Sequence, residues 1–235
     1  MAKASPDILQ EQIGYHFRDP QLLLDALTHS SYAREVTNAQ QDNEQLEFLG
    51  DAVLNFLVSV KLADAFPHFP EGKLSRARAR LVAAEHLGRV ALRLELGNYL
   101  RLGRGEEKTG GRAKLSLMVN ALEALVAAVY RDGGLRATQR FIQRFILPGD
   151  LEAVAPDLFT IDYKSALQEH LQAERLGPAS YRVLSEAGPE HRKIFMVEAR
   201  AGGHGSARGS GNSKKTAEQQ AARTLLDQLR KGRNA

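Results

Sequence analysis

Apolar residues recur at helical spacing through most of the first 148 residues of the chain. A repeat of three or four residues places apolar side chains on one face of a helix, which can then be buried against its neighbours. The clearest stretches of this kind, separated by glycine and proline residues, are 19–33, 43–65, 73–94 and 115–131. The pattern predicts an all-α domain of about eight or nine helices over residues 6–148.

The pattern changes after residue 148. Residues 149–160 contain proline and glycine, show no amphipathic period of useful length, and are predicted to form a linker. A helical stripe, three short alternating or glycine-rich strands and an alanine-rich helix then follow at 162–176, 180–185, 194–201, 203–209 and 214–229. Residues 161–230 are therefore predicted to form a small α+β domain with the order α-β-β-β-α.

The distribution of charge supports this division into two domains. Residues 161–235 carry 13 Lys and Arg against 8 Asp and Glu, whereas residues 1–160 carry 19 against 20. The whole basic surplus of the chain therefore lies in its C-terminal part. Both an ordinary solvated surface and a surface that binds a polyanion would account for this surplus.

Composition excludes several classes of protein. The chain is 43% hydrophobic and 26% charged, close to the average of globular domains, so extensive disorder is not expected. It has no cysteine, which excludes a disulfide framework, a thiolate zinc site and a cysteine nucleophile. Residues 1–7 lack the apolar stretch of a signal peptide, and no apolar run approaches the ~18 residues of a membrane span. We therefore expect a cytoplasmic protein without a membrane partner.

Three acidic residues share one face of the predicted helix 43–65. Glu44, Glu47 and Asp51 are spaced by three and four residues and have no basic residue at the position that would pair with them. Carboxylates arranged in this way repel one another unless water screens them or a cation binds, and their oxygens suit Mg²⁺. A solvated acidic helix face would show the same spacing.

A second acidic position lies in the otherwise apolar helix 115–131. Glu123 is expected to be buried there, close in sequence to Asn120, and a buried carboxylate needs a compensating charge or a proton. A metal ion held between the two helices would satisfy Glu47, Asp51 and Glu123 together. The alternative is an ion pair between Glu123 and an arginine of the preceding basic segment, namely Arg76, Arg78 or Arg80.

The segment 43–54, N-E-Q-L-E-F-L-G-D-A-V-L, resembles the signature helix of bacterial ribonuclease III and departs from its usual form only at Gln45 and Ala52. The C-terminal domain is similar to the double-stranded-RNA-binding domain with which these enzymes end. Other motifs of the family follow in its order, at 27–32, 71–75, 102–106, 110–112, 123–125 and 130–134. The resemblance therefore covers nearly the whole chain.

The resemblance implies a catalytic site made of acids. Glu47, Asp51 and Glu123 would bind the catalytic Mg²⁺, for which Mn²⁺ can substitute, with Asp51 and Glu123 closest to the chemistry. Glu44 and Glu71 match acids that line the same cleft.

The resemblance also implies an activity and an assembly. Members of the family cut both strands of an RNA duplex as a homodimer, leave 5′-phosphate and 3′-hydroxyl ends with two-nucleotide 3′ overhangs, and process ribosomal RNA precursors and other structured RNAs. Phe48 matches an aromatic residue that packs across the dimer interface, although by itself it could equally be a core residue.

One departure from the family pattern concerns the metal site. Asn120 stands where the family commonly has an aspartate. An amide oxygen can bind Mg²⁺ but brings no charge, so we expect weaker metal binding. The alternative function is a noncatalytic double-stranded-RNA-binding protein silenced by Asn120, but the survival of every other acid of the site favours an active enzyme.

Three regions of the C-terminal domain match the RNA contacts of the family. A protein recognises an RNA duplex by its shape, through 2′-hydroxyl groups in the minor groove and phosphates across the major groove. Lys214 and Lys215 begin the last predicted helix, where unpaired N–H groups and the helix dipole favour a phosphate. The matching residues of the first helix and of the loop between the first two strands are Lys164, Ser165, Gln168, Glu169 and His191.

Overall fold

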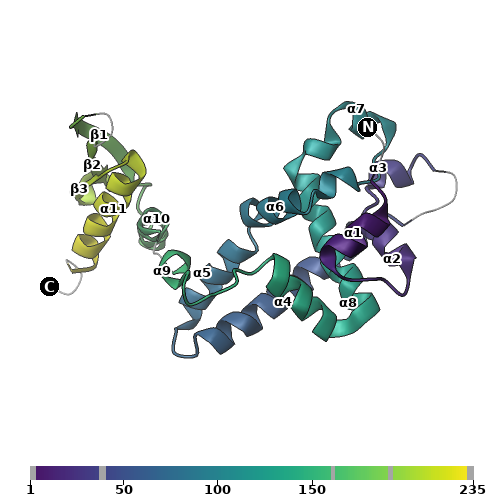
Figure 1. Cartoon of the computed structure of the whole chain (residues 1–235). Coiled ribbons are helices and arrows are strands. Elements are labelled where there is room, and N and C mark those ends of the chain that lie inside the picture. Colours follow the sequence, from purple (N-terminus) through teal and green to yellow (C-terminus); the bar gives the residue numbers. More distant parts are fainter. Residues whose placement is uncertain (1–3, 37–40, 160–161, 190–192, 232–235) are drawn as a thin grey trace. The chain divides into compact units, whose positions relative to one another are not determined.

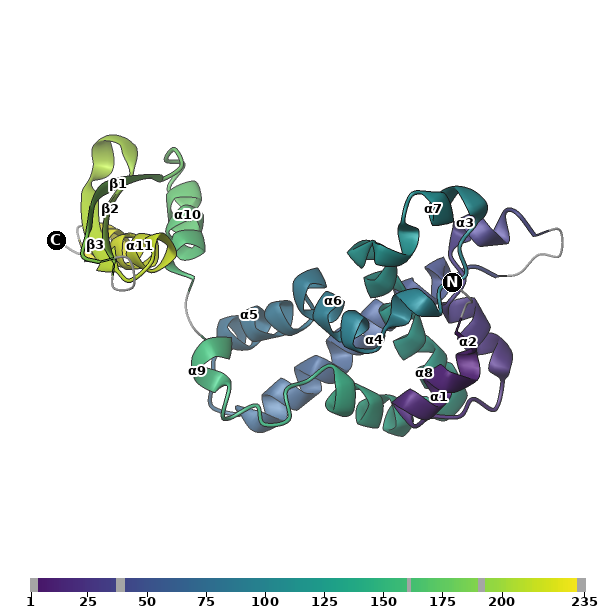
Figure 2. The ribbon, with the colours of Figure 1, turned by 45° about the horizontal axis from the view of Figure 1, so that its top comes forward.

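The chain folds into two compact units. The computed structural model describes residues 4–36, 41–159, 162–189 and 193–231, which divide into the units Met1–Phe159 and Thr160–Ala235 (Figures 1 and 2). Each unit has its own hydrophobic core. The first is helical and the second combines a three-stranded sheet with two long helices, which confirms the predicted fold class. No helix in these described ranges is long and apolar enough to cross a bilayer.

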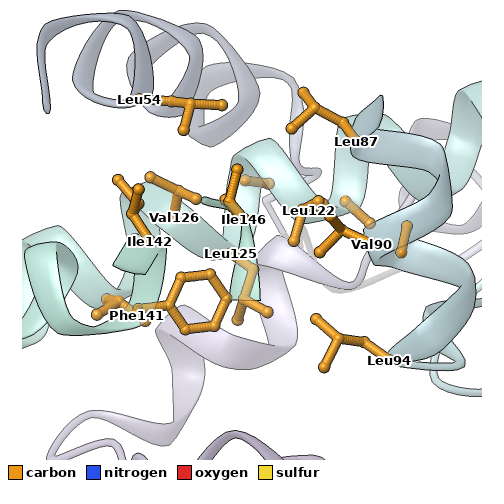
Figure 3. Packing of buried hydrophobic residues seen from close by; sticks show 14 of the residues in the cluster. Leu54, Leu87, Val90, Leu94, Leu122, Leu125, Val126, Phe141, Ile142 and Ile146 are labelled. Carbon is orange, nitrogen blue, oxygen red and sulfur yellow. The ribbon is translucent and has the colours of Figure 1, made fainter. Parts of the chain in front are cut away.

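The first unit is built around one long central helix, α8, against which α4, α6 and α2 pack. Figure 3 shows buried side chains of α4, α6 and α8 meeting in this core, among them Leu54, Leu87, Leu122, Leu125 and Val126. The α-helices among the described residues of this unit are α1 (Pro6–Ile13), α2 (Pro20–Ala26), α3 (Ser30–Ala33), α4 (Glu44–Ala65), α5 (Glu71–Leu81), α6 (Ala84–Arg93), α7 (Arg104–Lys108), α8 (Leu115–Phe145) and α9 (Ala155–Leu158).

Short breaks, at residues 27–29 and 82–83, divide the predicted helical stretches in two places. His29 has extended backbone angles and separates α2 from α3, and its ring accepts a hydrogen bond from the Ser31 N–H. Ala83 is likewise extended and separates α5 from α6. In contrast α8 continues beyond the predicted end of its stretch, across a break at Gly134 (φ 69°). A glycine tolerates this positive φ without the steric cost that other residues would incur.

Much of the expected linker packs against the first unit. Leu151 and Leu158 are buried in its core. The ring of Phe159 lies edge-on to those of Phe66 and Phe69, with centroids 4.8 and 4.6 Å apart. The boundary between the two units therefore lies at residues 159–160. The bounds expected for the helical domain (6–148), the linker (149–160) and the α+β domain (161–230) stay predictions.

The second unit is a sheet covered on one face by two helices. Its strands are antiparallel in the order β1-β2-β3. The third strand begins later than the pattern predicted, because a 3₁₀ turn occupies Gly202–His204. The elements are α10 (Tyr163–Ala173), β1 (Ser180–Ala187), β2 (Ile194–Arg200), β3 (Ser206–Gly211) and α11 (Lys214–Lys231).

Small residues bring the sheet and α11 close together. Ala199 and Ala207 are opposite each other on β2 and β3 and are buried with Ala221 and Leu225 of α11. A Cβ at Gly209 of β3 would lie 2.2 Å from the backbone nitrogen of Ala221. The alanine-rich pattern of the last helix therefore reflects close packing on the sheet.

The closest approach of α4 to α8 gives a prediction about stability. A Cβ at Gly50 would lie 1.8 Å from the carbonyl oxygen of Glu123, a backbone atom that cannot rotate away. We expect Gly50→Ala to lower the free energy of unfolding by about 2 kcal/mol or more, measured by chemical denaturation. Gly105→Ala is the control, since its Cβ would meet nothing within 4 Å. A Gly50→Ala variant as stable as wild type would show that the two helices are not in contact.

Candidate functional site

The contact between α4 and α8 brings together the acids that the sequence singled out. Gly50 lies at the contact, with Glu47 one turn before it and Asp51 directly after it, and its partner on α8 is the backbone of Glu123. Asn120, one turn before Glu123, donates a hydrogen bond from its amide to the carboxylate of Glu47. We refer to Glu47, Asp51, Asn120 and Glu123 as the acidic group.

The carboxylates of this group act on one another electrostatically. Burial, followed by the negative charges of Asp51 and Glu47, raises the pKa of Glu123 to about 7. Burial and the charge of Glu44 also raise the pKa of Glu47, against the hydrogen bond from Asn120, which lowers it. The negative charges of Glu44, Glu47 and Asp51 thus disfavour the ionised forms of Glu47 and Glu123.

Two of the three arginines considered as partners of Glu123 are engaged elsewhere. Arg78 donates a hydrogen bond to the Ser59 hydroxyl (3.0 Å), and Arg80 donates one to the Leu158 carbonyl (2.8 Å). The charges that shift the pKa of Glu123 are both negative. A proton or a bound cation, rather than an arginine, therefore compensates the charge of this half-buried carboxylate.

Asp51, Glu44 and Glu71 lie in more open surroundings. Asp51 is exposed, and its Oδ1 accepts a hydrogen bond from Asn55 Nδ2 at 2.9 Å, which orients the carboxylate. Glu44 is exposed in the first turn of α4. Glu71 is exposed at the start of a third helix, α5, where it accepts a hydrogen bond from the Ser75 hydroxyl at 2.5 Å. A shared cleft for Glu44 and Glu71 stays a prediction.

The donor atoms of the acidic group fit a hard divalent cation. They are three carboxylates and one amide, and Mg²⁺ prefers oxygen ligands of both kinds. Within the described ranges, no three Asp, Glu or His side chains converge closely enough to form a complete set of metal ligands. A divalent cation bound among them would offset the mutual repulsion of these carboxylates.

Phe48 is not a core residue. Its side chain is 82% exposed on α4, and Phe56, two turns further along the same helix, is 54% exposed. Two exposed phenylalanines on one helix leave a large apolar area in contact with water, which is typical of a surface that binds another protein.

The predicted RNA contacts of α10 lie at the helix start and along its exposed side. Asp162 caps the helix by accepting hydrogen bonds from the backbone N–H groups of Lys164 (3.1 Å) and Ser165 (3.2 Å). The same carboxylate accepts from Gln219 of α11 at 2.7 Å, so the two helices are joined here. Gln168 and Glu169 follow on the helix and are exposed. His191 lies outside the described residues.

The two lysines at the start of α11 differ in their surroundings. The helix is capped by Ser213, whose hydroxyl accepts a hydrogen bond from the Thr216 N–H (3.1 Å). Lys215 is exposed, whereas Lys214 lies 3.0 Å from a carboxylate oxygen of Glu186 on β1. Sequence reasoning missed this carboxylate, because helical spacing would instead have paired Lys214 with Glu218.

Known proteins match both units. A model of the ribonuclease-III-like family matches residues 19–149, and a model of the double-stranded RNA binding motif matches residues 163–229. Ribonuclease 3 of Solibacter usitatus is 48% identical over 240 residues, which cover 97% of this chain and 88% of that relative. The chain belongs to the ribonuclease III family. The resemblance seen in the sequence is thereby confirmed.

Other ribonuclease III proteins give the same result. Ribonuclease 3 of Caldanaerobacter subterraneus is 43% identical over 221 residues, which cover 94% of this chain and 96% of that relative. The crystal structure of the nuclease domain of ribonuclease III from Campylobacter jejuni has a TM-score of 0.57 and 36% identity, and the match covers 60% of this chain and 96% of that one. As a member of the ribonuclease III family, the chain is an endoribonuclease.

The raised pKa of Glu123 predicts how stability depends on pH in the absence of divalent cations. The folded chain binds this proton more tightly than the unfolded chain, in which the pKa is near its ordinary value of 4.5. The contribution of Glu123 to stability is therefore present at low pH and is lost as the pH rises toward about 7. Unfolding experiments in EDTA should show this fall in wild type and a smaller one in Glu123→Gln.

Glu152→Gln provides the comparison for this experiment, because Glu152 is an exposed glutamate outside the acidic group. It should keep the pH dependence of wild type. An unchanged pH dependence in Glu123→Gln would show that the pKa of Glu123 is the same in the folded and the unfolded chain.

Proposed function

We propose that this endoribonuclease hydrolyses phosphodiester bonds in double-stranded RNA and depends on Mg²⁺, with Mn²⁺ as a substitute. The observation that carries the proposal is the acidic group at the contact of α4 and α8, in a chain whose second unit matches the double-stranded RNA binding motif. The products would carry 5′-phosphate and 3′-hydroxyl ends with two-nucleotide 3′ overhangs. Ribosomal RNA precursors and other structured RNAs would be its substrates.

The acidic group would supply the ligands of the cation. Bound Mg²⁺ would polarise a phosphoryl oxygen and lower the pKa of a water molecule for in-line attack on phosphorus. Two neighbouring amides hold the ligands in place: Asn55 donates to Asp51, and Asn120 donates to Glu47. The amide oxygen of Asn120 would serve as a further oxygen ligand.

We propose that the enzyme acts as a homodimer through its first unit. The exposed Phe48 and Phe56 on α4 support this assembly, because leaving a large aromatic side chain in water costs about 1.5–3 kcal/mol relative to burying it. The Campylobacter jejuni structure is described as showing flexibility in a region of the nuclease domain that is involved in dimer formation. In a two-fold dimer Phe48 would meet the same surface of the partner.

We assign duplex binding to the second unit. Asp162 at the start of α10 accepts a hydrogen bond from Gln219 in the second turn of α11, which supports a binding surface that includes the starts of both helices. Lys164, Ser165, Gln168 and Glu169 would face one minor groove, and His191 the next. Lys214 and Lys215 would contact phosphates across the major groove between them.

The proposed activity is tested with a long, perfectly paired RNA incubated with the protein in Mg²⁺ or in EDTA, followed by sizing and end analysis of the fragments. We expect cutting only with Mg²⁺. Glu123→Gln should reduce cutting by about 100-fold or more, since residues that merely orient metal ligands already contribute about 10- to 100-fold. The variant should still bind the duplex in a gel-shift assay. Binding without cutting by wild type, even with Mn²⁺, would contradict the proposal and support the noncatalytic alternative.

Asn120 gives a separate prediction about metal binding. Asn120→Asp adds a negative charge beside the proposed cation, so the Mg²⁺ concentration for half-maximal cleavage should fall by about three-fold or more. The product ends should not change. Asn98→Asp is the control, because it adds the same charge at an exposed position outside the acidic group. An unchanged or raised Mg²⁺ requirement in Asn120→Asp would exclude position 120 from the metal site.

A further inference from the structure

Two of the lysines proposed to contact RNA are held by carboxylates of their own domain. Lys164 Nζ lies 2.8 Å from Glu218 Oε2, and Lys214 Nζ lies 3.0 Å from Glu186 Oε1. The first ion pair joins α10 to α11, and the second joins β1 to α11. The lysine side chains are 37% and 58% exposed, so an incoming phosphate can still reach them.

The two carboxylates lie among the proposed RNA contacts. Glu218 follows Lys214 by one turn of α11, and Glu186 is the next-to-last residue of β1. A phosphate that approaches either lysine therefore meets a negative charge beside it. The phosphate must compete with the carboxylate for the ammonium group and is repelled by it.

Two aromatic rings also contact these lysines, and neither ring carries a negative charge that would compete with a phosphate. Lys164 Nζ lies 4.5 Å from the centre of the Tyr181 ring, and Lys214 Nζ lies 5.6 Å from that of Phe195. These contacts attract an ammonium group through the ring face. Removing the carboxylates should therefore leave both ammonium groups close to their present positions and free to bind phosphate.

We propose that Glu186 and Glu218 compete with RNA phosphates for Lys214 and Lys164 and so lower the affinity of the domain for duplex RNA. This inference rests on the proposed function of the second unit. An endonuclease must release product duplexes that present the same backbone as its substrate, and weaker backbone contacts speed that release. The two glutamates thus set duplex affinity below what the lysines alone would provide.

The test measures the dissociation constant of the full chain for a labelled duplex of about 20 base pairs, slightly longer than the ~16 that one such domain spans. The assay contains EDTA, so no cleavage occurs. Glu186→Gln and Glu218→Gln should each tighten binding by about two- to five-fold at about 0.1 M salt, the range expected for partly exposed ion pairs. The gain should shrink as salt rises, because exposed charges are screened.

Asp227→Asn is the matched control. Asp227 is exposed on the same helix, thirteen residues after Lys214 and so about 20 Å along it, and its substitution changes the net charge equally. It should leave affinity nearly unchanged. In a Lys214→Met background, Glu186→Gln should lose its effect, since the competition requires the lysine. Thermal unfolding of each variant monitors folding, and the two glutamate sites test the proposal independently.

The outcomes separate this inference from the proposed function. If wild type binds the duplex but neither glutamate variant binds more tightly than Asp227→Asn, the inference is wrong and the proposed function stands. A gain from Glu186→Gln that persists in the Lys214→Met background also overturns it. A wild-type chain that does not bind the duplex overturns both.

Discussion

The close contact of α4 with α8 at Gly50 is the constraint on which the first unit depends. Gly50 lets the two helix backbones meet, and the atom it meets belongs to Glu123, whose side chain is the half-buried acid of the site. The same contact therefore serves packing and chemistry. The core around Leu122 and Leu125 holds α8 in position, so the spacing of the carboxylates is fixed by apolar packing rather than by the acids themselves, which repel one another.

Helical periodicity predicted the fold class and most helices, because the apolar positions of each helix are the ones that tertiary packing buries. It failed near His29 and Ala83, since a break of two or three residues divides a helix without disturbing the apolar pattern on either side. It also failed after residue 148. Three apolar residues of that segment, Leu151, Leu158 and Phe159, show no helical period, yet each packs within the first unit.

Spacing and expected burial within each helix singled out the acids of the candidate site. The resemblance to ribonuclease III then implied that acids of both helices bind one metal ion. Spacing could not show which partner each charge finds in space. The pairs of Lys164 with Glu218 and of Lys214 with Glu186 join residues far apart in the chain, and no local pattern reports them. The proposed RNA-binding surface is therefore less basic at these two lysines than the sequence alone suggests, although the C-terminal part carries the whole positive surplus.

Asn120 lowers the unfavourable electrostatic free energy that the acidic group has when no cation is bound. An aspartate in its place would add another negative charge to a group in which burial and repulsion already raise the pKa of Glu123 and Glu47. The amide instead donates a hydrogen bond to Glu47, which favours the ionised form of that carboxylate and relieves part of the unfavourable energy. A site with an aspartate at position 120 would be stabilised fully only when a metal ion neutralised its charges. With Asn120, part of that stabilisation does not require the proposed metal ion. The amide thus makes the fold of this nuclease less dependent on the supply of divalent ions.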